Sequence, residues 1–101
     1  MMVKLLMSWD IKPGRDAEYF EFVVREFVPG ITGMGLRPTE AWLTVYGNTS
    51  QILTGGIAED LDTMRGILQS EEWVKLNDRL KELVTNYRQR VVKATGTLQI
   101  F

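Results

Sequence analysis

Hydrophobic residues recur along this chain with two different periods, and the order of the periods is the feature that most limits the fold. A period of two predicts strands at residues 2–9, 39–46, 51–58 and 89–101. A helical period predicts helices at residues 16–28, 61–68 and 71–87. The long elements therefore run β-α-β-β-α-β. This α+β order folds as a four-stranded antiparallel sheet with both long helices on one face.

The first predicted helix follows a break at Pro13-Gly14 and should end at about residue 28, because Pro29-Gly30 comes next. Phe22 then projects towards its polar side as an exposed contact. The residues expected on the buried face of this helix are Ala17, Phe20, Val23, Val24, Phe27 and Val28.

Each of the two later helices is preceded by a side chain suited to capping. Asp60 comes before the shorter helix and Ser70 before the longer one, and both side chains are able to accept a backbone N–H bond. We expect the longer helix to supply much of the core. Its apolar stripe is predicted to contain Trp73, Leu76, Leu80, Leu83, Val84 and Tyr87.

The second and third strands are predicted to form an antiparallel hairpin, because residues 47–50 (Gly-Asn-Thr-Ser) suit a tight reversal. Gly55-Gly56 in the third strand indicates either a bulge or a close approach of two backbones. In the last strand, the residues expected to face the core are Val92, Ala94, Leu98 and Ile100. Those expected on the opposite face are Val91, Lys93, Thr95, Thr97, Gln99 and Phe101.

The chain contains no histidine and no cysteine. That composition excludes Ser-His-Asp triads, cysteine nucleophiles, zinc sites built on nitrogen or sulfur, and histidine-ligated haem. We therefore expect neither a metal nor a cofactor. With 101 residues, the chain is expected to form a single domain over residues 1–101, since a second core would be too small to be stable.

Positive and negative charges are balanced and interspersed along the chain. Twelve basic and 13 acidic residues give a net charge of −1, so we expect neither nucleic acid nor a membrane surface as a partner. The apolar run at residues 5–7 is too short for the core of a signal peptide, and the uncharged stretch at residues 41–58 is too polar to span a bilayer. A cytoplasmic location is the default expectation.

The predicted sheet has one face that no helix covers. The hairpin strand is expected to bring Trp42, Thr44 and Tyr46 to that face, and the last strand to bring Val91 and Phe101. An aromatic and apolar surface of this kind is too large to stay in water on so small a domain. We therefore expect a second copy of the chain to cover it, which gives a homodimer through the sheet face.

Four segments carry a resemblance to a known family. They are the strand-to-helix junction IKPGRDAEY (residues 11–19), the helix exit VPG (28–30), the hairpin AWLTVYG (41–47) and the helix start SEEW (70–73). Over nearly its whole length the chain resembles the dimeric α/β-barrel superfamily, in which ferredoxin-like subunits pair through their sheets. The superfamily includes cofactor-free monooxygenases of the antibiotic-biosynthesis type, haem-degrading enzymes, small lactone isomerases and ligand-sensing domains. The lack of histidine argues against the haem branches.

Two groups of aromatic residues are candidates for a ligand pocket. Trp42 and Tyr46, with Thr44 between them, suit the stacking of a planar aromatic molecule, and packing in the core or in a dimer interface is the alternative. In the second group, Trp9 and Tyr19 are hypothesised to meet Arg65 at the mouth of a pocket.

Lysines on strands are a third candidate. Lys93 and Lys4 each lie in a predicted strand, where a buried ammonium has a lowered pKa and serves as a base or holds a phenolate. The alternative is that they are edge charges that discourage aggregation.

Two functions from different classes follow. As the resemblance implies, the chain is a homodimer that binds a small aromatic molecule and oxygenates a phenolic substrate without a cofactor. That chemistry requires the protein only to position the substrate anion and exclude water. The second function is not enzymatic: a ligand-sensing or scaffold dimer, which needs no catalytic group.

Overall fold

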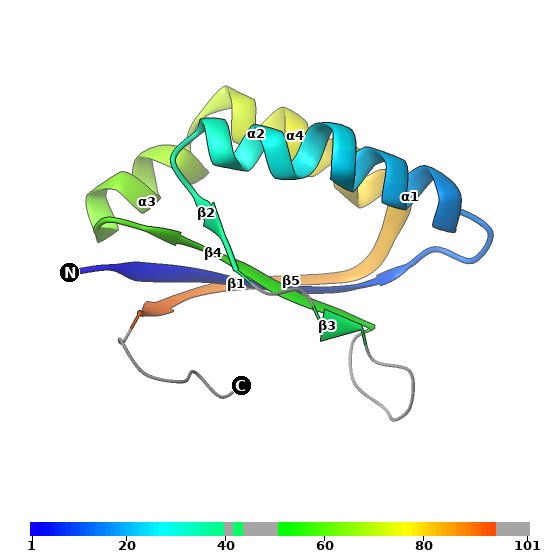
Figure 1. Cartoon of the computed structure of the whole chain (residues 1–101), viewed down its shortest axis with the longest axis horizontal. Helices are drawn as coiled ribbons and strands as arrows, with labels where there is room; N and C mark the ends of the chain where they lie inside the picture. The colour runs from blue at the N-terminus through cyan, green and yellow to red at the C-terminus, as the bar shows by residue number, and fades with distance from the viewer. Residues whose placement is uncertain (40–41, 44–50, 95–101) are drawn as a thin grey trace.

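The computed structural model describes residues 1–39, 42–43 and 51–94. In it the strands form one antiparallel sheet, and the helices lie on one side of that sheet (Figure 1). The strands are β1 (Val3–Ile11), β2 (Arg37–Pro38), β3 (Trp42–Leu43), β4 (Ile52–Ala58) and β5 (Val84–Lys93). The helices are α1 (Asp16–Phe22), α2 (Val28–Gly33), α3 (Leu61–Leu68) and α4 (Glu71–Leu83), and a π-helical segment, η1 (Val23–Phe27), joins α1 to α2. The predicted α+β order is confirmed.

Strand β1 lies in the middle of the sheet. It pairs antiparallel with β4 on one side and β5 on the other, and β2 pairs with the far edge of β4, so that the order is β2-β4-β1-β5. Strand β3 also pairs antiparallel with β4, which confirms the predicted pairing of the second and third strands. The predicted turn at residues 47–50 lies outside the described residues.

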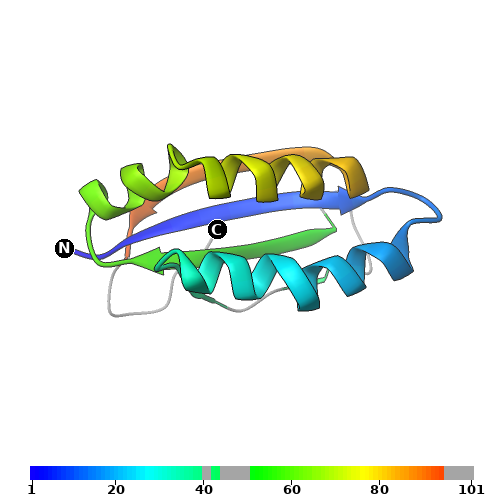
Figure 2. The same ribbon diagram turned by 90° about the horizontal axis from the view of Figure 1, so that it is seen from above.

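Alternate residues of β1 point to the two faces of the sheet. Leu5, Met7 and Trp9 face the helices and are almost completely buried. Figure 2 shows the layer of helices lying over the sheet from above. The neighbouring residues Leu6 and Ser8 point to the opposite face, which no helix covers (Figure 1). The core therefore lies between the helices and one face of the sheet only.

The first helical segment differs from the prediction in its length and in its buried face. It continues through Pro29 to Gly33 instead of ending at residue 28, and Phe22, expected to be exposed, is buried. Phe20 and Val24, expected in the core, are 50% and 69% exposed. The residues that are buried are Tyr19, Phe22, Phe27 and Ile31.

The π-helical segment η1 explains both differences. A regular α-helix has 3.6 residues per turn, so the five-residue step from Phe22 to Phe27 would carry Phe27 off the buried face. In η1 the N–H of Val28 bonds to the carbonyl of Val23, five residues back, which turns Phe27 towards the sheet again. Pro29 then lies within the first two residues of α2, a position that tolerates proline.

Strand β5 begins at Val84, directly after α4, and not at residue 89 as predicted. Val84 and Tyr87 therefore belong to a strand and not to the stripe of the last helix. The predicted faces of this strand are also reversed, because Val91 pairs with Leu5 on the helix side, whereas Val92 pairs with Lys4 on the uncovered side. Pairing with β1 fixes this register, which alternation within one strand cannot determine.

The two predicted helix caps are confirmed. The carboxylate of Asp60 accepts a bond from the N–H of Thr63 at 2.8 Å, and the hydroxyl of Ser70 accepts one from the N–H of Trp73 at 3.2 Å. At Gly55 the close approach is the correct alternative, because an added Cβ would lie 2.7 Å from the carbonyl oxygen of Leu5. The register between β1 and β4 runs from Val3 to Trp9 without a shift.

Candidate functional site

An aromatic cluster of Trp9, Tyr19, Phe27 and Tyr87 fills the space between the sheet and the helices at one end of β1. The indole N–H of Trp9 donates a 2.9 Å bond to the hydroxyl of Tyr19. Tyr19 and Phe27 meet Trp9 edge to face, and the ring of Tyr87 stacks on it. These four rings pack against one another, so this region is a side-chain core.

The two phenols of the cluster are poor candidates for a general base. Burial raises the pKa of Tyr19, and the bond from Trp9 only partly opposes that effect. Burial also raises the pKa of Tyr87, with a smaller opposing effect from Asn77. Both hydroxyls therefore stay protonated at neutral pH. Their role is to form hydrogen bonds and to fill space.

Tyr87 connects the cluster to the rim of the domain, as the sequence predicts for its hydroxyl. That hydroxyl donates a 2.6 Å bond to the side-chain carbonyl of Gln89, and the ammonium of Lys81 lies 5.1 Å from the centre of the ring. Behind it, Asn77 of α4 is 7% exposed, and its Oδ1 atom has no hydrogen-bond partner among the described residues.

The candidate residues named from the sequence do not converge on one place. Trp9 and Tyr19 meet, but Arg65 lies on α3 at the other end of the sheet (Figure 1), exposed and 3.9 Å from Asp62. Lys93 pairs with Val3 and is exposed, six residues of β1 away from Trp9, or about 20 Å.

The remaining candidates belong to the hairpin. The backbone of Trp42 pairs with that of Leu53 in β4. Thr44 and Tyr46 lie outside the described residues. Stacking of a ligand on this strand therefore stays a prediction.

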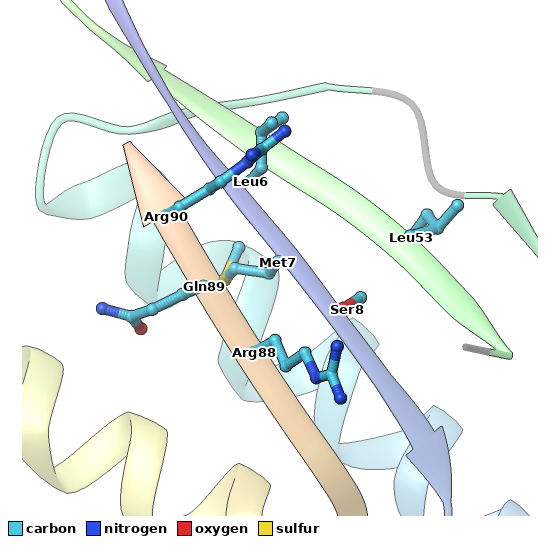
Figure 3. A pocket seen from close by; sticks show the side chains of 7 residues that line it. All are labelled: Leu6, Met7, Ser8, Leu53, Arg88, Gln89 and Arg90. Carbon is cyan, nitrogen blue, oxygen red and sulfur yellow. The ribbon is translucent and has the colours of Figure 1, made fainter. Parts of the chain in front are cut away.

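A groove of about 330 Å³ lies on the uncovered face of the sheet, and we call it the sheet-face groove. Figure 3 shows the residues that line it: Leu6, Met7, Ser8, Leu53, Arg88, Gln89 and Arg90. They come from β1, β4 and β5, three adjacent strands. Leu6 and Leu53 give the groove an apolar floor, and Ser8 contributes a hydroxyl.

Two arginines dominate the charge of the sheet-face groove. Arg88 pairs with Ser8 and Arg90 with Leu6, so both side chains belong to the uncovered face, where Figure 3 shows them extending from β5 towards β1. Gln89, between them, points away. Within the described part of the chain, neither guanidinium has an ion pair or a hydrogen bond.

Sequence reasoning missed these arginines because it began the last strand at residue 89 and turned the even-numbered residues to the core. The signal was present: Arg88, Arg90 and Val92 alternate, and two guanidiniums are rarely buried in a core without partners. No three acidic side chains gather closely enough to hold a metal ion among residues 1–39, 42–43 and 51–94. Nor does this part of the chain contain a helix long and apolar enough to cross a bilayer.

Comparison with known proteins identifies the fold. No family model and no curated protein matches the chain. Among solved structures, a NIPSNAP family protein from Agrobacterium tumefaciens has a TM-score of 0.69 at 20% identity, covering 94% of this chain and 87% of that one. SnoaB, a cofactor-independent oxygenase from Streptomyces nogalater, has a TM-score of 0.71 at 17% identity, covering 96% of each chain.

A third similar structure is a dimeric protein of unknown function with a ferredoxin-like fold, from Bacteroides fragilis. Its TM-score is 0.63 at 19% identity, and the match covers 92% of this chain and 96% of that one. The chain therefore has a ferredoxin-like fold, which is the fold that the resemblance in its sequence implies.

Proposed function

We propose that this chain is a homodimer that binds a small aromatic molecule in the sheet-face groove and oxygenates a phenolic substrate without a cofactor. The observation that carries the proposal is the groove itself: an apolar floor beside two guanidiniums, on a sheet face that no helix covers. Its volume of about 330 Å³ lies at the lower end of the range for small-molecule sites.

A second copy of the chain is the occupant that best suits the uncovered face. Ile57 of β4 and Val92 of β5 add apolar area there, next to the groove. The similar protein from Bacteroides fragilis is described as dimeric with the same type of fold. Pairing of two such faces encloses the groove and excludes water from a bound molecule.

Cofactor-independent oxygenation fits the chemistry of the groove. A phenolate supplies all the electrons: one oxygen atom of O₂ enters the substrate as a carbonyl and the other leaves as water. The protein needs to favour the phenolate over the phenol, and nearby guanidiniums do so by lowering the pKa of a bound hydroxyl. The likeness to SnoaB, a cofactor-independent oxygenase, supports this choice of reaction.

Oxygen uptake with anthrone as the substrate tests the reaction. We expect uptake by the wild-type protein and at least a tenfold loss in Arg88→Gln, about the effect of removing one stabilising charge. Arg25→Gln is the matched control, since Arg25 is exposed on the helical side of the domain and should leave uptake unchanged. A wild-type protein that neither takes up oxygen with anthrone nor binds anthrone would contradict the proposal.

The non-enzymatic alternative has one specific observation in its favour. The aromatic cluster is filled by its own side chains, and its two tyrosines are held protonated, so that region offers no base. Binding of anthrone that depends on Arg88 but is accompanied by no oxygen uptake would identify a ligand-sensing or scaffold dimer.

A further inference from the structure

We infer that the dimer closes over the sheet face together with an oxyanion held between Arg88 and Arg90, so that a planar aromatic carboxylate or phenolate strengthens the association of the two copies. This inference rests on the proposed dimer. It adds the chemical class of the ligand and makes the strength of the association depend on that ligand.

Arg88 and Arg90 lie on the same face of the sheet. They are two residues apart on β5 and opposite Ser8 and Leu6, which places them on the same face. Two residues of a strand span about 6.6 Å, so the two side chains start close together on β5, and Figure 3 shows Arg90 reaching towards Leu6 and Arg88 lying nearer Ser8. One carboxylate or phenolate is small enough to lie between the two guanidiniums.

The uncovered face of the sheet carries several positive charges. The cationic residues at register positions on this face are Lys4, Arg37, Arg88 and Arg90. β1 contains one acidic residue, Asp10, and both oxygens of its carboxylate already accept hydrogen bonds. One oxygen accepts the N–H of Gln51 at 2.7 Å and the other accepts the side-chain amide of Asn86 at 2.9 Å.

Covering these positive charges with a second copy of the chain is unfavourable in free energy. A guanidinium does not lose its proton in a protein, so Arg88 and Arg90 stay charged when a second sheet removes their water. Burial of a cation without a counter-charge is strongly unfavourable, and two adjacent cations add repulsion. Closing the dimer therefore favours an anion in the groove. Because the floor is made of Leu6 and Leu53, the ligand that suits it has a flat apolar body behind its oxyanion.

Linkage then connects ligand and assembly. A ligand that binds the closed dimer better than the single chain lowers the apparent dissociation constant of the dimer. A neutral molecule of the same shape occupies the floor but leaves the guanidiniums without a counter-charge. A pair of isosteric probes therefore separates the effect of charge from the effect of shape.

The experiment is sedimentation equilibrium of the full chain at constant ionic strength, with 2-naphthoate or its neutral isostere 2-naphthamide. For the wild-type protein we expect 2-naphthoate to lower the apparent dimer dissociation constant at least about tenfold, and 2-naphthamide less than about twofold. The double variant R88Q/R90Q should dimerise at least as tightly as wild type without ligand, because repulsion is gone, and should no longer respond to 2-naphthoate. Arg25→Gln should behave as wild type.

The two proposals fail in different ways. In one outcome the wild-type protein is a dimer, and its dissociation constant is the same with 2-naphthoate as with 2-naphthamide and the same as that of R88Q/R90Q. That result would overturn the link between anion binding and dimer strength, but not the dimer itself. A chain that stays monomeric at micromolar concentration in every sample, R88Q/R90Q included, would overturn the proposed dimer itself.

Discussion

The indole ring of Trp9 and the phenol ring of Tyr87 lie parallel across neighbouring strands, with centroids 5.9 Å apart and ring planes 5° apart. When the β1–β5 register of Val3 to Ser8 is continued by one residue, Tyr87 lies opposite Trp9, and the register then shifts by one residue before Asp10. Asn86, just before Tyr87, adopts a φ of 56°, the left-handed conformation that asparagine tolerates better than most residues. Asn86 is thus the extra residue of β5 at this shift, directly beside the stacked pair.

Substitution of Asn86 separates the backbone effect from the side-chain effect. Both Asn86→Gly and Asn86→Ala lose the bond to Asp10, but glycine adopts the left-handed backbone without strain, whereas alanine keeps a Cβ there and tolerates that backbone less well than asparagine. We expect Asn86→Ala to unfold with about 1–2 kcal/mol less free energy than Asn86→Gly. Urea denaturation measures the difference, and equal stabilities would contradict it.

Asp10 makes stability depend on acid pH. The side-chain bond from Asn86, and then the backbone bond from Gln51, hold the pKa of Asp10 below its ordinary value of 3.8. Since the folded-state pKa is the lower one, the contribution of the carboxylate is complete above the unfolded-state pKa and is lost as pH falls through the folded-state pKa. Asp10→Asn should therefore be less stable than wild type at neutral pH.

The free energies of unfolding of wild type and Asp10→Asn should converge as pH falls below about 4. Urea midpoints measured from about pH 6 down to about pH 2.5 check this expectation. A difference between the two proteins that stays constant over the whole range would show that the bonds of Asp10 do not favour its charged form.

Tyr19 is the acceptor for a buried donor. In Tyr19→Phe the indole N–H of Trp9 keeps its buried place and loses its partner, which should cost about 1–3 kcal/mol. Gln89→Ala is the control, because it removes an exposed acceptor of the Tyr87 hydroxyl and should change stability by less than about 0.5 kcal/mol. Equal thermal shifts for the two variants would argue against a buried Trp9–Tyr19 bond.

Two glycines differ in the space around them. A Cβ on Gly55 would lie 2.7 Å from the backbone oxygen of Leu5, which has little freedom to move. We expect Gly55→Ala to destabilise the protein by about 1–3 kcal/mol. Gly66, within α3, has nothing within 4 Å of an added Cβ, so Gly66→Ala should stabilise it by about 0.5–1 kcal/mol. Chemical denaturation of both variants tests the contrast.

Local patterns in the sequence were sufficient for the element order and for the caps. Asp60 and Ser70 were predictable because a cap depends on one side chain and the next turn of helix. Gly55 was predictable as a special position because glycine weakens the interior of a strand and commonly marks a bulge or a close backbone approach there. These features are determined within a few residues of chain.

The predictions were wrong where contacts between residues far apart in the sequence determine which side chains are buried. The π-helical segment η1 keeps Phe27 on the buried face with Phe22, whereas a regular helical period places these two residues on different faces. The faces of β5 depend on its pairing with β1, and an error of one residue in that register exchanges Val91 with Val92. The same error hid Arg88 and Arg90, so the candidate site could not be located from the sequence.

Pairing of two copies through the uncovered sheet face is the claim on which the groove and its ligand depend. Sedimentation velocity at about 10 μM chain measures it directly. Wild type and Phe20→Glu, which alters an exposed residue on the helical side, should sediment with twice the mass of one chain. Leu53→Lys, which adds a third cation to the floor of the groove near Arg88 and Arg90, should sediment as a single chain. A wild-type protein with the mass of one chain, or a Leu53→Lys protein that remains dimeric, would contradict the account.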